Sequence, residues 1–108
     1  METQFVKIVV FVPESHADKI RETLGNAGTG KIGNYSFCSF SVKGIGRFQP
    51  IGGARPAIGS VGKLEEVQEE RIEVMCPRSQ MEAALDAIRK AHPYEEPATD
   101  IYPIETIS

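Results

Sequence analysis

The chain has 108 residues, of which 41% are hydrophobic and 25% are charged, and its formal net charge is −3 at pH 7. These values predict one globular domain over residues 1–108, and the acidic excess argues against nucleic acid or a membrane as a partner, since proteins that bind either usually carry basic patches. Glu2 stands where a signal peptide has cations, no apolar run is long enough to span a bilayer, and two cysteines are too few for a disulfide scaffold, so we expect a cytoplasmic protein.

Two similar stretches indicate an internal repeat. Residues 7–18 read KIVVFVPESHAD and residues 71–82 read RIEVMCPRSQME. Both combine a basic residue, an Ile-x-Val run, a proline, a serine and an acidic residue in the same register. The β-rich run predicts a strand that ends at its proline, because proline donates no hydrogen bond to a sheet. Ser15 and Ser79 are then expected to cap the two helices that follow.

In the first half of the chain, apolar residues recur at helical spacing after this strand. These positions are Ala17, Ile20, Leu24 and Ala27. Gly28 is expected to end the helix. Residues 34–44, NYSFCSFSVKG, predict the returning strand, with alternate side chains on opposite faces. Tyr35 and Phe37 are assigned to one face, and Cys38, Phe40 and Val42 to the other. Cys38 is expected to be a small core residue.

A glycine-rich segment over residues 44–63, GIGRFQPIGGARPAIGSVGK, follows this strand and holds six of the ten glycines. It fails the P-loop pattern, since Lys63 is followed by Leu64 instead of Ser or Thr. Arg47, Arg55 and Lys63 are candidate ligand-binding residues that could meet an anion; alternatively, the loop turns tightly and keeps its cations in water. About twenty residues exceed what a hairpin needs, so we expect a long loop or ribbon that contacts a partner.

The second half repeats the pattern with a long strand within residues 63–76 and a second helix. The apolar positions of this helix are Met81, Ala84, Leu85, Ile88 and Ala91. The helix is expected to end before residues 92–97, HPYEEP, because a residue that precedes proline disfavours helical geometry. A last strand is predicted around residues 99–104, and Pro103 places it at an edge of the sheet or ends it there.

The HPYEEP segment also carries the candidates for a metal site. His92, Glu95 and Glu96 combine an imidazole with two carboxylates, which suit a divalent transition metal. Alternatively, the acids face water and Tyr94 packs on the sheet, since no two of these ligands have the i, i+4 spacing of a helical metal motif. With two histidines in the chain, we assign no catalytic residue.

The predicted order is strand, helix, strand, long loop, strand, helix, strand. Two βαβ units on one antiparallel sheet, with both helices on one face, make an α+β ferredoxin-like sandwich. The other face of this sheet would leave apolar side chains in water. A second copy of the same surface is the simplest cover, so we expect a homo-oligomer with Phe48 and Ile51 in or beside the interface.

Three stretches resemble one protein family. They are GKIGNYSFCSF (30–40), GIGRFQPIGGARPAIGSVGKLEEVQEE (44–70) and AHPYEEPATDIYPI (91–104). Together they resemble the domain inserted in the middle of the longer bacterial NIF-three-like proteins of the YqfO type, and the resemblance covers nearly the whole chain. It implies a fold similar to that of the PII signalling and CutA ion-tolerance proteins, which are ferredoxin-like trimers. CutA proteins carry a comparable HPYE stretch.

The resemblance also limits what can be transferred to this chain. The longer relatives flank the insert with segments that supply His, Asp and Glu metal ligands, whereas we expect this chain to be the insert alone. No residue here inherits those ligands. The resemblance therefore implies a small self-associating module that binds a small ligand, an ion or a protein, with residues 44–63 as its contact element. Two alternatives stay open: a metal-dependent hydrolase acting on a nucleotide, and a structural trimerisation unit that partners a separate metal-binding domain.

Overall fold

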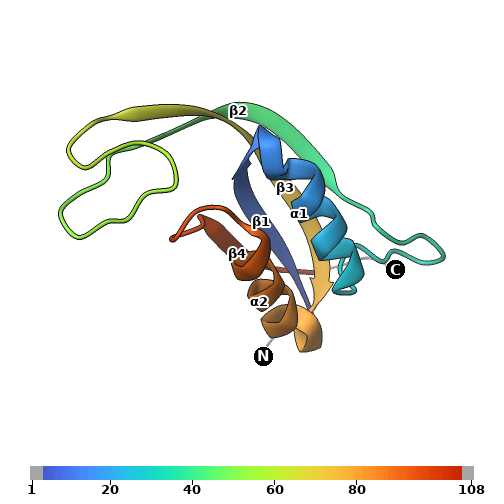
Figure 1. Cartoon of the computed structure of the whole chain (residues 1–108). Coiled ribbons are helices and arrows are strands. Elements are labelled where there is room, and N and C mark those ends of the chain that lie inside the picture. The colour runs from blue at the N-terminus through green and yellow to red at the C-terminus, as the bar shows by residue number, and fades with distance from the viewer. Residues whose placement is uncertain (1–3, 106–108) are drawn as a thin grey trace.

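A computed structural model describes residues 4–105, which form four strands and two α-helices (Figure 1). In chain order the elements are β1 (Phe5–Pro13), α1 (Glu14–Asn26), β2 (Phe40–Phe48), β3 (Glu65–Pro77), α2 (Met81–Ala91) and β4 (Thr99–Ile104), and a short 3-10 turn (Arg78–Gln80) precedes α2. The order of the elements is the one that the internal repeat predicted, and β4 has the predicted bounds.

The strands form one antiparallel sheet in the order β2-β3-β1-β4. Both helices cover the same face of this sheet (Figure 1). Each helix returns the chain past one intervening strand, which is the split βαβ arrangement. The predicted α+β fold of four antiparallel strands and two helices is therefore confirmed. β4, with its Pro103, lies at an edge of the sheet as expected.

The strands β2 and β3 extend beyond the rest of the sheet. Pro13, the last residue of β1, pairs with Glu69 of β3. Residues 65–68 of β3 therefore pair only with residues 45–48 of β2. Figure 1 shows this two-stranded ribbon curving away from β1 and β4, with the connection of residues 49–64 at its end.

The hydrophobic core lies between the sheet and the two helices. Its buried side chains are Val6, Ile8, Val10 and Val12 of β1, Ile72, Val74 and Cys76 of β3, Ala17, Ile20 and Leu24 of α1, and Ala84 and Ile88 of α2. Ala27, Met81, Leu85 and Ala91 pack against its margin. Both apolar stripes predicted from the sequence are thus confirmed. Neither helix in residues 4–105 is long and apolar enough to cross a bilayer.

Neither helix begins with the predicted serine cap. α1 starts at Glu14 directly after Pro13, so Ser15 lies inside its first turn. Ser79 lies in the 3-10 turn, and Gln80 occupies the position before α2 without a side-chain cap. The prediction was wrong because Pro13, with a ψ of 143°, already has the extended geometry of the residue before a helix.

β2 begins at Phe40, whereas the sequence predicted a strand from residue 34. A tight turn occupies the preceding residues. The N–H groups of Ile32 and Tyr35 each donate to the other's carbonyl oxygen at 2.9 Å, and Gly33 between them has a φ of +56°. The strand limits follow from pairing with β3, which local alternation of side chains cannot report.

Phe37 and Cys38 lie outside the strand to which the sequence assigned them. Phe37 has a φ of +58°, and its ring packs so closely against Gly25 of α1 that no Cβ fits there. Cys38 is half-buried and is not a core residue. Its backbone N–H donates to the carbonyl oxygen of Gly30 at 2.8 Å. These contacts hold the connection of residues 27–39 against the end of α1.

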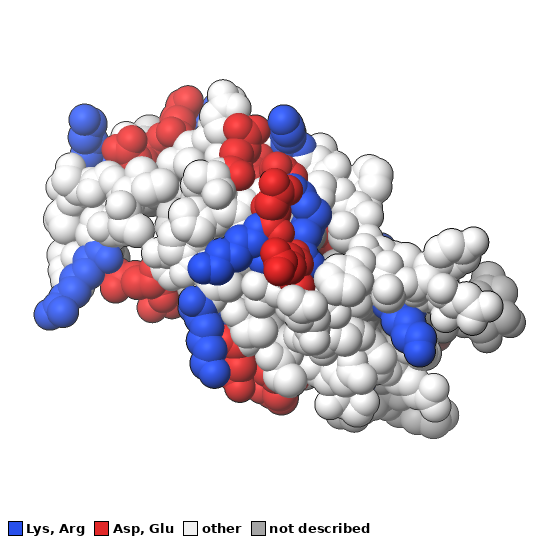
Figure 2. Space-filling view, turned by 45° about the vertical axis from the view of Figure 1, so that its right-hand side comes forward, with Lys and Arg blue, Asp and Glu red and all other residues white. Residues whose placement is uncertain are grey.

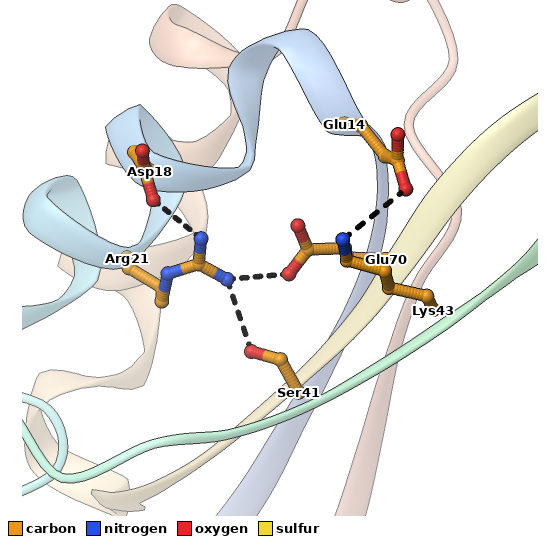
Figure 3. Close-up of polar contacts among 6 residues, drawn as sticks. All are labelled: Glu14, Asp18, Arg21, Ser41, Lys43 and Glu70. Atoms are coloured by element: carbon orange, nitrogen blue, oxygen red, sulfur yellow. Dashed lines mark hydrogen bonds and ion pairs between the residues drawn. The ribbon is translucent and has the colours of Figure 1, made fainter.

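Arg21 links α1 to two strands on the helix-covered face (Figure 3). Its guanidinium donates to Oε1 of Glu70 on β3 at 2.6 Å and to Oγ of Ser41 on β2 at 3.1 Å. It also donates to Oδ1 of Asp18, one turn earlier in α1, at 2.5 Å. The hydrogen bonds to Asp18 and Glu70 raise the pKa of Arg21. Because Glu70 is nearly buried, this contact supplies the positive charge that its carboxylate requires.

Candidate functional site

A pocket of about 540 Å³ lies between the β2–β3 connection and the segment that follows α2. Its size falls in the range of small-molecule sites. Most of the lining is apolar, and a few polar side chains converge on it. The lining consists of Phe11 of β1, Gly46, Arg47 and Phe48 of β2, Glu69 of β3, Gln49, Pro50, Ile51, Ala54, Pro56, Ala57 and Ile58 of the connection, and Tyr94, Glu95, Glu96 and Ala98 after α2.

The β2–β3 connection closes on itself to form one wall of the pocket. The N–H of Gly62 donates to the carbonyl oxygen of Pro50 at 2.7 Å, and the N–H of Ala54 donates to that of Ile51 at 3.0 Å. Gly53 has a φ of +93°, a conformation that favours glycine. Pro50 is buried, so this part of the connection packs against the protein.

A hydrogen bond ties the connection to the segment after α2. The backbone N–H of Arg55 donates to Oε1 of Glu95 at 2.8 Å. Glu95 and its neighbour Glu96 both line the pocket. Two groups of residues that the sequence presented separately, the loop around Arg55 and the acids of HPYEEP, therefore meet at one site.

His92 is a buried structural residue beneath this site. Its Nε2 lies 2.7 Å from the carbonyl oxygen of Phe11, and its Nδ1 accepts a hydrogen bond of 3.1 Å from the N–H of Tyr94. A carbonyl oxygen only accepts, so these partners assign the proton to Nε2 of a neutral ring. Burial lowers the pKa of His92, and the hydrogen bond to Phe11 opposes this effect. Both ring nitrogens are thus occupied.

Tyr94 positions a buried carboxylate in the pocket. Its hydroxyl donates to Oε2 of Glu69 at 2.9 Å, and its ring meets that of Phe48 edge-on with centroids 5.6 Å apart. Burial and the hydrogen bond to Glu69 raise the pKa of Tyr94, so the hydroxyl keeps its proton at neutral pH. The Glu69 carboxylate lies so close to Gly46 that a Cβ at residue 46 would collide with it. Glycine at this position therefore makes room for the carboxylate.

The structure separates the six candidate residues of the sequence. Arg47, Glu95 and Glu96 line the pocket. Arg55 contacts it through the bond of its backbone N–H to Glu95, as described. His92 lies beneath Tyr94, and Lys63 lies in an exposed turn where its N–H donates to Ser60 at 3.2 Å.

Sequence reasoning missed Glu69, the most buried carboxylate of the pocket. No local signal in the sequence indicated it, because the residue lies in an alternating strand at a position where a charge is expected in water, and it is the distant Tyr94 that contacts its carboxylate. Phe11 was also missed, since it was read only as part of an apolar strand.

The residues proposed from the sequence as metal ligands do not assemble into a metal-binding group. Within residues 4–105, no three His, Cys, Asp or Glu side chains are placed to hold a metal ion together. His92 already uses both ring nitrogens. The metal site at His92, Glu95 and Glu96 stays a prediction that this geometry does not support.

Arg47 is the one basic residue among the residues that line the pocket. Nε of Arg47 lies 3.2 Å from Oε1 of Glu66, and both side chains are exposed. Figure 2 shows basic and acidic side chains interspersed on the face that it displays, without an extended patch of one sign. What the pocket can do chemically is bind and orient a small, largely apolar molecule next to a carboxylate.

Comparison of the sequence with known proteins finds close relatives, although no protein-family model matches the chain. It is 52% identical over 99 residues to the GTP cyclohydrolase 1 type 2 homologue of Bacillus subtilis, which is 92% of this chain and 26% of that protein. The homologue of Mycobacterium tuberculosis is 50% identical over 96 residues, 89% of this chain and 25% of that protein. The chain thus spans about a quarter of the length of these relatives.

Solved structures agree with both the sequence match and the fold. A Bacillus cereus protein related to NIF3 superposes with a TM-score of 0.84 at 45% identity, over 98% of this chain and 27% of that one. The periplasmic divalent cation tolerance protein CutA of Archaeoglobus fulgidus superposes with a TM-score of 0.70 at 18% identity, over 96% of this chain and 87% of that one. The second likeness shows the fold alone.

Proposed function

We propose that this chain, which is homologous to a segment of the NIF3-related proteins and has a CutA/PII-like fold, is a self-associating module that binds a small ligand and is not a catalyst by itself. The observation that carries the proposal is the pocket, in which the long β2–β3 connection and the HPYEEP segment converge on Glu69. Pockets of this size with a few converging polar groups are the usual sites of small ligands.

The sheet face opposite the helices, which we call the open face, supports self-association. Ile72 and Val74 of β3 point into the core, so Glu73 between them and its pairing partner Phe40 point to the open face. Phe40 is 65% exposed, and Val42, two residues further along β2, is 49% exposed. Burying a large apolar side chain contributes roughly 1.5–3 kcal/mol, so a covering copy of the chain would gain several such contributions.

The two edge strands of the sheet support a closed ring of copies. β2 and β4 are the edge strands, so each leaves one row of backbone groups unpaired within the sheet. A head-to-tail contact between two different surfaces closes into a ring when its rotation allows. We propose a trimer by resemblance to PII and CutA proteins, with Phe48 and the 73% exposed Ile51 in or beside the interface. A protein partner would contact residues 44–63.

We do not expect this chain to have the activity after which its relatives are named. The match covers about a quarter of their length. We therefore expect the purified chain to show no GTP hydrolysis above a buffer blank. Robust hydrolysis that a substitution of Glu69 or His92 abolishes would contradict the proposal.

Light scattering coupled to gel filtration tests the assembly. The expected mass is three times the 11.8 kDa of the chain. A clean monomer at micromolar concentration would overturn self-association, whereas a dimer would reject the stoichiometry alone. A thermal-shift screen of small molecules tests binding, because a ligand that binds only the folded state raises its stability.

A further inference from the structure

We propose that the pocket takes a small organic cation, an ammonium group on an apolar or aromatic body, with the Glu69 carboxylate as its counter-ion. This inference rests on the proposed binding function and adds the chemical class of the ligand. Three features around Glu69 define the ligand: the charge of its carboxylate, an oxygen that accepts no hydrogen bond from the protein, and the aromatic walls of the pocket.

Glu69 is a buried carboxylate whose partners are incomplete. The residue is 8% exposed and lines the pocket. Oε2 accepts the hydrogen bond from Tyr94, whereas Oε1 accepts none from any residue in the described part of the chain. Oε1 is not among the buried polar atoms without a partner, so water can reach it, and Glu69 makes no ion pair within residues 4–105. A ligand that displaces this water must supply an opposite charge or further donors to the carboxylate. A cationic N–H donor supplies both.

The remaining charges of the pocket favour the same sign of ligand. Glu95 and Glu96 add two carboxylates to the lining, and Arg47 is the one basic residue among the lining residues. Arg47 is exposed and pairs with Glu66 at 3.2 Å, and the guanidinium of Arg71 lies 5.7 Å from the ring of Phe11. An anionic ligand would therefore meet three carboxylates, whereas a cation would be attracted by them.

The walls define the rest of the ligand. The rings of Phe11, Phe48 and Tyr94 face the pocket together with proline and isoleucine side chains of the connection. Aromatic faces attract ammonium groups and also pack against apolar bodies. The volume of about 540 Å³ suits a free small molecule. The occupant is therefore a free amphipathic amine and not the lysine side chain of another protein.

Calorimetric titration with three probes of similar shape tests the class of ligand at neutral pH. The probes are 2-phenylethylammonium, 2-phenylethanol and 3-phenylpropionate. We expect the cation to bind at least about tenfold more tightly than the alcohol and the anion, as a hydrogen bond to a charged partner predicts. Equal affinity for the cation and the alcohol, or preference for the anion, would overturn the inference.

A matched pair of variants tests the role of Glu69. Glu69→Gln keeps the size of the side chain and removes its charge, so it should weaken binding of the cation about tenfold and leave binding of the alcohol unchanged. Glu22→Gln alters an exposed carboxylate of α1 outside the pocket and should change neither affinity. An unchanged cation affinity in Glu69→Gln contradicts the proposal.

Amide chemical shifts of the wild-type chain keep the test decisive if Glu69→Gln does not fold. Titration with 2-phenylethylammonium should shift the resonances of Phe48, Glu69 and Tyr94, and shifts confined to other surfaces would overturn the site. If no probe binds while light scattering shows an oligomer, the ligand class fails and self-association stands. If the thermal-shift screen instead finds an anion whose titration shifts these three resonances, the proposed ligand class is wrong and the pocket remains the binding site.

Discussion

The hydroxyl of Tyr94 donates a hydrogen bond of 2.9 Å to Oε2 of Glu69, and this bond joins the segment after α2 to β3 inside the pocket. It is the hydrogen bond that holds the buried carboxylate in place among the described residues. Tyr94→Phe would leave that carboxylate without a donor. We expect a loss of about 1–3 kcal/mol in the free energy of unfolding, the usual effect of stranding a buried polar group.

Urea unfolding measures this loss, and Tyr35→Phe is the matched control. Tyr35 is 75% exposed, and its hydroxyl bonds to no residue between 4 and 105. Its substitution should change stability by less than about 0.5 kcal/mol. Equal effects of the two substitutions would show that the Tyr94–Glu69 bond contributes nothing.

Stability should fall on mild acidification because of His92. Burial, with a smaller effect of His16, lowers the pKa of His92 in the folded protein below the ordinary 6.5, while the Phe11 bond and Glu69 act in the opposite direction. The unfolded chain therefore takes up the proton first, and stability is lost as pH falls from the ordinary value toward the folded one. Protonation would also place an N–H on Nδ1 against the N–H of Tyr94.

Urea midpoints from about pH 7.5 to about pH 5 measure this effect. His92→Gln should show a smaller loss of stability over this interval than wild type. The same slope in both proteins would rule out His92 as the source.

Replacing Arg21 should lower the free energy of unfolding far more than replacing Arg89, which also pairs with an aspartate three residues earlier in its helix. Arg21→Gln leaves Glu70, whose side chain is 11% exposed, without its cation, so we expect a loss of about 1–3 kcal/mol. Arg89→Gln removes an exposed pair with Asp86 at the same i, i+3 spacing and should cost about 0–0.5 kcal/mol. Chemical denaturation of both variants compares them, and similar losses would contradict the role of Glu70.

Gly25→Ala should destabilise the protein, although alanine favours a helix by about 1 kcal/mol. The ring of Phe37 occupies the space where the new methyl group would lie, so we expect a net loss of about 1–3 kcal/mol from overpacking. In a Phe37→Ala background this clash is absent and the same substitution should stabilise. Thermal unfolding of the four proteins measures the change of sign, and stabilisation by Gly25→Ala alone would disprove the contact.

Phe40→Asp should dissociate the oligomer. The substitution places a charge on the open face, which self-association would bury without a partner. Light scattering should then report a smaller mass at micromolar concentration, with the folded monomer retained by circular dichroism. Ile32→Asp, at a 54% exposed position in the connection before β2, should leave the mass unchanged. An unchanged mass in Phe40→Asp would place the interface elsewhere.

The sequence by itself determined the elements whose signals are local. The repeat around Pro13 and Pro77 located the ends of β1 and β3, since proline donates no hydrogen bond to a neighbouring strand. The stripes ending at Ala27 and Ala91 located both helices, because one buried face needs apolar residues every three or four positions. Homology to the NIF3-related proteins was also readable from the motifs alone.

The tertiary structure decided everything that depends on residues far apart in the chain. β2 starts at Phe40 because its register with β3 sets its limits. The bond from Arg55 to Glu95 joins residues 40 positions apart, and that from Tyr94 to Glu69 joins residues 25 apart. No local pattern reports such contacts, because the free energy of burying a carboxylate or closing a pocket depends on which segments the fold brings together. The pocket therefore came only from packing the β2–β3 connection against the segment after α2.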